Sequence, residues 1–143
     1  MSKEVSARTL GIDLGSGDER ELFRWFLASF LFGKRIQQDI AMDTYRVIVE
    51  KYERDTPRKL GNCSRRELVS MLGEGRYVRY DESTAERLLG LSAKIQAEYG
   101  GKIGNIQAAS KDREDFEKRL QEFKGVGPKT VEIFMREAAT VWY

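Results

Sequence analysis

Apolar residues recur every three to four positions along most of the chain, which is the spacing of one face of an α-helix. Residues 18–32 carry a stripe wide enough to predict a buried helix. Asp18 is a suitable N-cap for it, because a carboxylate accepts the free N–H groups of a first turn. A second stripe predicts a helix over residues 36–52. The apolar positions of the first helix are Leu22, Phe23, Phe26, Leu27, Phe30 and Leu31.

Two helices are predicted in the middle of the chain. Ser64 and Glu67 have the spacing of a capping box, which predicts a short helix over residues 64–72. A longer stripe predicts a helix from about residue 82 that ends at the glycine pair 100–101. The apolar positions of this longer helix are Leu88, Leu91, Ile95 and Tyr99.

The last third of the chain predicts two more helices. Ser110 is expected to cap a charged helix whose apolar face carries Phe116, Leu120 and Phe123. The final helix begins at Pro128, because proline suits the first helical turn, and it continues to the end of the chain.

The remaining stretches are predicted to lack helix. Residues 54–62 are interpreted as a basic loop, and residues 73–80 as a connector. Residues 1–17 are small, polar and rich in glycine, so we expect a flexible leader followed by one folded domain over residues 18–143. The expected fold class is all-α, a compact bundle of about six helices.

Composition limits the chemistry. The 143 residues include one cysteine and no histidine, so disulfide frameworks, cysteine-rich zinc sites, iron–sulfur clusters and histidine-based catalysis are excluded. We expect no metal and no cofactor. The longest apolar run, near Phe26, is too short to span a bilayer, and an intracellular location is expected. Because the net charge is only +2, nucleic acid would have to bind to a local patch.

The stretch "FKGVGPKTVEIFM", residues 123–135, joins the last two predicted helices. Gly125 and Gly127 permit backbone conformations and close approaches that a Cβ would prevent, and Pro128 starts the next helix. Val126 is expected to turn inward and to fix the hairpin on the core. The N–H groups of the hairpin and of the following helix then form a surface that favours phosphate.

Three side chains strengthen the prediction of phosphate binding. Lys124 and Lys129 add positive charge beside the hairpin, and Thr130 is expected to add a hydroxyl donor. The alternative interpretation is a simple corner between two helices, in which the glycines only make the bend.

The same residues resemble the helix–hairpin–helix of the endonuclease III-like DNA glycosylase superfamily. The resemblance extends from residue 21 to residue 143, and it is strongest at the hairpin. It implies an all-α fold, duplex DNA as the partner, a nucleoid-associated location and excision of damaged or mispaired bases. It also implies that Lys129 occupies the place of the lysine that forms a Schiff base with the sugar in bifunctional members.

The sequence also departs from the pattern of that superfamily. The catalytic aspartate follows the lysine by about eighteen residues there, which lies beyond Tyr143, and the iron–sulfur segment follows in many members. Lys34 stands in the region where the superfamily often carries a glutamine that fills the gap of a flipped base. Glu132 is expected to form a surface ion pair with Lys129 rather than to replace the aspartate.

Three functions therefore remain open. The first is a DNA-binding protein of the base-excision-repair type that cleaves abasic sites through a lysine. The second is a complete glycosylase whose carboxylate comes from elsewhere in the chain or from a partner subunit. Self-association into a homodimer that rebuilds a groove is a separate alternative. The third is a DNA-binding or recruitment module that has the fold without the chemistry.

The connector "GEGRYVRY" is a second candidate contact with DNA. Arg76 and Arg79, with Tyr77 and Tyr80, would brace a bent strand through charge and stacking. The alternative is a solvated loop whose tyrosines pack on the core.

Overall fold

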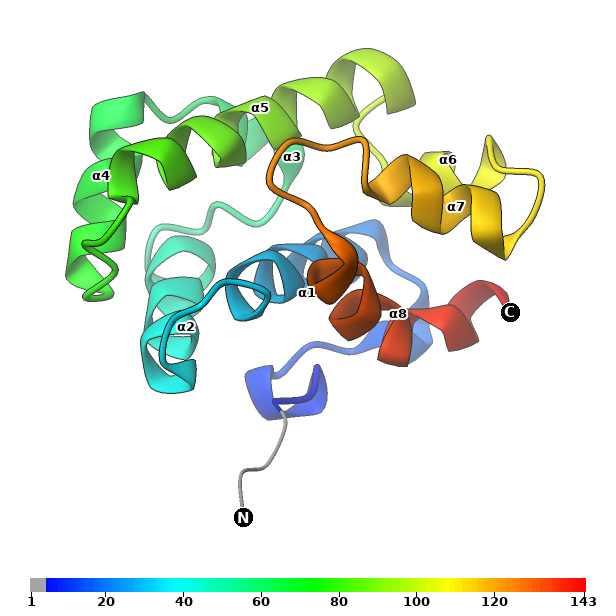
Figure 1. Cartoon of the computed structure of the whole chain (residues 1–143), viewed down its shortest axis with the longest axis horizontal. Coiled ribbons are helices and arrows are strands. Elements are labelled where there is room, and N and C mark those ends of the chain that lie inside the picture. Colours follow the sequence, from blue (N-terminus) through cyan, green and yellow to red (C-terminus); the bar gives the residue numbers. More distant parts are fainter. Residues whose placement is uncertain (1–4) are drawn as a thin grey trace.

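The computed structural model describes residues 5–143, which form helices and connecting loops without a strand among them (Figure 1). The predicted all-α fold is confirmed, with eight α-helices in this part of the chain where about six were expected. They are α1 (Glu19–Phe32), α2 (Gln38–Tyr45), α3 (Pro57–Gly61), α4 (Arg65–Glu74), α5 (Asp81–Tyr99), α6 (Ile103–Ala108), α7 (Arg113–Leu120) and α8 (Pro128–Trp142). Two 3₁₀ turns, η1 (Arg8–Leu10) and η2 (Leu14–Ser16), precede α1, and a π-helical segment, η3 (Arg46–Lys51), follows α2.

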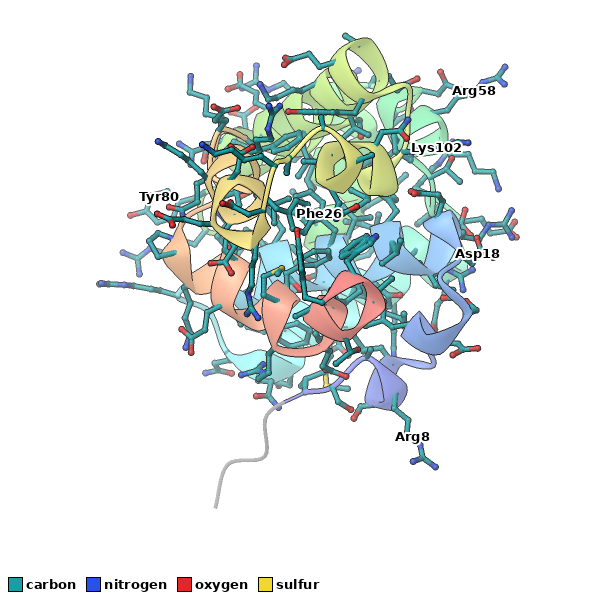
Figure 2. The ribbon with its side chains drawn as sticks, turned by 90° about the vertical axis from the view of Figure 1, so that its right-hand side faces the viewer. Arg8, Asp18, Phe26, Arg58, Tyr80 and Lys102 are labelled. Carbon is teal, nitrogen blue, oxygen red and sulfur yellow. The ribbon has the colours of Figure 1, made fainter. Side chains whose placement is uncertain are left out.

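The helix α1 lies in the middle of the molecule, with the other helices around it (Figure 1). The six apolar residues that the sequence assigned to its core face are buried, as predicted. The indole N–H of Trp25 donates a hydrogen bond of 3.1 Å to the Phe134 carbonyl of α8. Phe26, near the centre in Figure 2, makes edge-on ring contacts with Phe123 and Phe134 at centroid distances of 5.9 and 5.4 Å. Phe26 of α1 therefore packs both against Phe123, before Gly125, and against Phe134 of α8.

Local capping signals locate two helix starts correctly. The Asp18 carboxylate accepts a hydrogen bond of 3.0 Å from the Arg20 amide at the start of α1. At the start of α4, the Ser64 hydroxyl accepts from the Glu67 amide, and the Glu67 carboxylate accepts from the Ser64 amide. Both predicted caps are confirmed. The predicted faces of α5 and α7 are also buried.

Two short helices lie where no helix was predicted. In the expected basic loop, α3 starts at Pro57, and the Thr56 hydroxyl accepts a hydrogen bond from the Lys59 amide at 3.1 Å. After the glycine pair, α6 is capped by Glu19 of α1, whose carboxylate accepts from the first two amides of α6 at 2.7 Å each. The cap of α6 therefore comes from a distant part of the chain.

The predicted cap of the charged helix was wrong. Asp112 is the N-cap of α7, because its carboxylate accepts a hydrogen bond of 2.8 Å from the Asp115 amide. The Ser110 hydroxyl instead donates to the Ile106 carbonyl at the end of α6. The predicted helix over residues 36–52 is helical for most of its length, but it changes from α to π geometry at Arg46.

Residues 5–17 are not the flexible leader that the sequence indicated. Their apolar side chains join the core, and the Ala7 amide donates a hydrogen bond of 3.0 Å to the Glu137 carboxylate of α8. Burial of these side chains stabilises a segment that has no regular helix. The part of the predicted leader at residues 1–4 lies outside the described residues. The buried side chains of the segment are Val5, Ala7, Leu10, Ile12 and Leu14.

From residue 5 onward, none of the helices combines the length and the apolar character that crossing a membrane requires.

Candidate functional site

The turn between α7 and α8, residues 121–127, is the hairpin, and its conformation depends on Gly125. This residue has a φ of 89°, in the left-handed region that favours glycine. A Cβ at this position would also lie 2.8 Å from Cδ of Arg87 and 3.2 Å from the Phe30 ring. The next residue, Val126, is buried and its amide donates to the Phe123 carbonyl, so the predicted inward turn of Val126 is confirmed.

Gly127 leaves the start of α8 open. It is the N-cap in extended geometry, no side chain caps the helix, and the first turn carries no acidic residue. The space around the missing Cβ of Gly127 is empty to 4 Å. Pro128 has no N–H, and the first intrahelical bond runs from the Val131 amide to the Gly127 carbonyl. The positive end of the α8 dipole therefore has no anionic side chain of this turn to satisfy it.

Of the three side chains expected beside the hairpin, two lie at the surface. Lys124 and Lys129 are exposed, and Lys129 Nζ lies 3.7 Å from the Glu132 carboxylate, with both side chains 64% exposed. The predicted surface ion pair of Lys129 and Glu132 is confirmed. The expected role of Thr130 is corrected: the residue is 2% exposed and its hydroxyl lies against Gly33, so this hydroxyl does not face a ligand at the surface.

The fold brings Lys34 to the hairpin. Gly33 permits this approach, since a Cβ there would lie 2.3 Å from the Thr130 hydroxyl. Lys34 Nζ donates a hydrogen bond of 2.8 Å to the Gly125 carbonyl, and it lies 4.1 Å from the centre of the Phe30 ring. Burial lowers the pKa of Lys34, and the nearby positive charge of Arg87 lowers this pKa further.

The connector between α4 and α5 divides into two parts. Arg76 pairs with Asp43 at 2.6 Å and with Asp39 at 3.3 Å, so its guanidinium is already bound to carboxylates of this chain. Tyr77 is buried, and its hydroxyl lies 2.9 Å from that of Thr84. This first part of the connector matches the alternative interpretation, a loop whose tyrosine packs on the core. The expected contact of Arg76 with DNA is therefore not favoured.

The second part of the connector faces solvent. Val78 and Tyr80 are 68% and 69% exposed, and Figure 2 shows Tyr80 at the edge of the molecule. The Arg79 guanidinium lies 5.2 Å from the centre of the Tyr80 ring. Arg79 and Tyr80 are therefore placed where charge and stacking are both accessible to a ligand.

A cleft of about 590 Å³ lies between the connection from α1 to α2 and the start of α5. Lys34, Arg35, Arg79 and Arg87 line it, and we call these four residues the cationic cleft. Tyr77 and Tyr80 also line it, and its lining includes no acidic side chain. Through Lys34 the cleft is continuous with the hairpin, so the two cationic surfaces form one region.

The sequence identified Lys34 and Arg79, but it did not identify Arg35 or Arg87 as part of the site. Arg87 is one of several charged residues on α5, and only the packing of α5 beside the hairpin distinguishes it. Arg35 follows Lys34 directly, so its neighbour was the available signal.

A second cleft of similar volume lies between the N-terminal segment and α8. Its lining includes Asp13 and Glu137 as well as Arg8 and Arg136, so its charges are mixed, whereas the charged side chains that line the cationic cleft are all positive. Within residues 5–143, no group of three or more potential metal ligands is arranged to hold a metal ion.

Comparisons with protein-family models, with curated proteins and with solved structures found no match to this chain. The interpretation of the site therefore depends on its own geometry and on the residues of the hairpin.

Proposed function

We propose that the chain binds duplex DNA through the hairpin and the cationic cleft, in the manner of a helix–hairpin–helix protein of the glycosylase type. The observation that carries the proposal is the open start of α8, where Gly127 leaves empty space and no side chain caps the helix. A phosphate is the ligand that such a helix start favours, because backbone N–H groups and the helix dipole both attract an anion.

The charges around this helix start support nucleic acid as the source of the phosphate. Lys124 and Lys129 flank the hairpin, and the cationic cleft continues the positive surface on the side of α5. A polymer with regularly spaced phosphates would contact both surfaces at once, whereas a free phosphate would occupy one of them. Exposed Tyr80 beside Arg79 adds a surface for stacking.

A module that binds DNA without cleaving it is the second candidate. The position of Lys129 favours it, because this lysine is largely exposed and has the Glu132 carboxylate as its neighbour. This is the arrangement of a surface ion pair rather than of an amine set in a cleft that would hold a sugar. On this view Lys129 contacts a phosphate.

The proposal is tested by the binding of a short fluorescent duplex at fixed salt concentration. In Gly127→Val a branched side chain would occupy the space where the phosphate approaches, and we expect binding at least about tenfold weaker, or about 1.4 kcal/mol. The fold should be retained, since φ at Gly127 is −110° and nothing lies within 4 Å of the new Cβ.

The matched control is Gly73→Val. Gly73 also has empty space around its missing Cβ, but it lies at the C-terminal end of α4, outside the hairpin. We expect this variant to bind the duplex as the unmodified chain does. Equal affinity of Gly127→Val and Gly73→Val, with both folded, would show that the hairpin is not the DNA-binding surface.

A further inference from the structure

The cationic cleft contains an amine whose surroundings differ from those of the other candidate, Lys129. Lys34 is half-buried, shares the lining of the cleft with Arg87, and has no acidic residue beside it in that lining. Lys129 lies at the surface with a carboxylate 3.7 Å away. These surroundings favour Lys34, not Lys129, as a lysine that reacts as a nucleophile.

We propose that Lys34 is the amine that forms a Schiff base with the opened sugar of an abasic site in DNA, while the guanidinium groups of the cationic cleft hold the flanking phosphates. The inference rests on the proposed function, because it requires that duplex DNA binds at the hairpin.

The position of Lys34 supplies the first argument. Its Nζ donates to the Gly125 carbonyl, two residues before the N-cap of α8. A strand whose phosphate lies at the start of α8 would therefore pass the opening of the cleft, within reach of a flexible lysine. Arg35, Arg79 and Arg87 line the same cleft as Lys34 from three segments of the chain, and guanidinium groups bind phosphates through paired hydrogen bonds.

The chemistry needs no group that the chain lacks. The neutral Lys34 amine adds its electron pair to the aldehyde carbon of the open sugar, which forms a C–N bond. The electron pair of the broken C=O π bond moves to the oxygen, which takes one proton from the nitrogen and gives a carbinolamine. The carbinolamine then loses its hydroxyl group and the second N–H proton as one water molecule, and the imine remains. An aldehyde is already electrophilic, so this step does not require the carboxylate that base excision uses.

The electrostatics of the cleft supply the second argument. Burial and Arg87 both lower the pKa of Lys34, which increases the neutral fraction of its amine. The neutral amine still donates an N–H to the Gly125 carbonyl and keeps its lone pair for the aldehyde. The Phe30 ring acts in the opposite direction, because its face attracts a cation. The remaining charged or titratable groups that line the cleft are Arg35, Arg79, Tyr77 and Tyr80.

The alternative role of Lys34 is purely structural: a cation that holds the hairpin through the Gly125 carbonyl. The experiment must therefore remove the nucleophile and keep the charge. Lys34→Arg does so, because a guanidinium still donates hydrogen bonds but does not form a stable imine. Lys129→Arg is the matched variant at the other lysine, and Lys34→Gln is a second variant in case arginine does not fit.

The assay is borohydride trapping on a duplex with one abasic site, made by excision of a single uracil, together with binding of the same duplex. We expect the unmodified chain to be trapped on the DNA. Lys34→Arg and Lys34→Gln should lose trapping, with binding by Lys34→Arg within a few-fold of the unmodified chain. Lys129→Arg, which keeps the positive charge beside the hairpin, should lose trapping only in proportion to any loss of duplex binding.

The outcomes separate this inference from the proposed function. Binding without trapping by the unmodified chain, or trapping that survives in Lys34→Arg and disappears in Lys129→Arg, would overturn the role of Lys34 and leave DNA binding intact. Failure to bind the duplex at all would overturn both. Trapping and duplex binding are measured separately on the same samples, so a loss of trapping is not mistaken for a loss of binding.

A second measurement needs neither a variant nor DNA. Pyridoxal 5′-phosphate carries an aldehyde and a phosphate, so it is a small probe for a reactive amine in a cationic cleft. At limiting concentration, followed by borohydride and peptide mapping, we expect the label on Lys34 before the exposed lysines. Labelling of Lys124 and Lys129 with none on Lys34 would contradict the proposal.

Discussion

The molecule contains two groups of cations that are satisfied in different ways. Around Asp55, which is buried, Arg24 lies at 2.9 Å, Lys59 at 3.4 Å and Arg20 at 3.6 Å; we call these four residues the Asp55 cluster. The cationic cleft has four cations in its lining and no carboxylate. The first group has its anion built into the fold, whereas the second group leaves the place of an anion to a ligand.

The helix starts show the same difference. The start of α4 is closed by the reciprocal hydrogen bonds of Ser64 and Glu67, and the start of α8 has only Gly127. Both helices expose N–H groups that need acceptors. The closed start and the Asp55 cluster stabilise the fold, and the open start and the cationic cleft are available for binding. Substitutions in the two regions should therefore affect different measurements.

The largest effect should come from removing the internal anion. Asp55→Ala leaves three cations without their shared carboxylate, and breaking a fully buried pair costs about 3–5 kcal/mol. We expect a smaller loss here, about 2 kcal/mol in the free energy of unfolding, because the cations themselves reach solvent. Urea unfolding measures this loss. DNA affinity per folded molecule should not change, and a loss of affinity as large as the loss of stability would remove the distinction between the two regions.

The Asp55 cluster should also make stability sensitive to acid. Burial alone would raise the pKa of Asp55, but the hydrogen bond from Arg24 and the charges of Lys59 and Arg20 lower the net pKa. A carboxyl with a lowered pKa in the folded state stabilises the fold above its unfolded pKa of about 3.9. That stabilisation is lost as the pH falls from there through the folded pKa. The unfolding free energy between pH 5 and 2 should fall more steeply for the unmodified chain than for Asp55→Asn.

A substitution at the open start of α8 should change the affinity for DNA rather than the stability of the fold. In Gly127→Asp the new carboxylate would cap the helix, a position where aspartate is favoured over glycine by a few tenths of a kcal/mol. The same carboxylate would repel phosphate, so duplex affinity should fall at least about tenfold, or about 1.4 kcal/mol. Gly127→Ser supplies an uncharged cap as the control and should keep more of the affinity. Unchanged affinity in a folded Gly127→Asp would show that no phosphate approaches this helix start.

The closed start of α4 is the counterpart. Ser64→Ala removes the hydroxyl that accepts from the Glu67 amide, which should cost about 1 kcal/mol of stability. Thermal unfolding measures the loss, and duplex affinity at a temperature where both chains are folded should be equal. A weaker affinity would mean that α4 contributes to the DNA surface.

The sequence predicted those parts of the fold whose signals are local. Asp18 and the Ser64–Glu67 pair lie within three residues of the amides that they cap, so the starts of α1 and α4 were readable. Thr56 followed by Pro57 is a local signal of the same kind, and it indicates the start of α3, which the prediction of a basic loop did not include. No local pattern indicates α6, because its capping carboxylate, Glu19, precedes it by more than eighty residues.

The residues of the site also divide into those that local sequence predicts and those that tertiary contacts decide. Val126 and the open position of Gly127 follow from the hairpin sequence itself. The burial of Thr130 depends on Gly33, and the pairing of Arg76 depends on Asp39 and Asp43, so tertiary contacts decided both against the expectation. The core positions of residues 5–17 likewise depend on packing with α1 and α8, which glycine-rich sequence does not reveal.

The smallest expected effect is a difference in the salt dependence of duplex binding between variants of two arginines that are three residues apart. Arg76 is bound to Asp39 and Asp43, whereas Arg79 lies in the cationic cleft beside the exposed Tyr80 ring. If Arg79 contacts one phosphate, Arg79→Ala should reduce the log–log salt slope of duplex binding by about one, because one fewer counterion is released. Arg76→Ala should leave that slope unchanged, since its side chain contributes no contact that salt can displace from DNA. Equal slopes for both variants and the unmodified chain would place Arg79 outside the DNA contact. A reduced slope for Arg76→Ala alone would mean that its pairs with Asp39 and Asp43 open when DNA binds, which would place the packed part of the connector in the DNA contact.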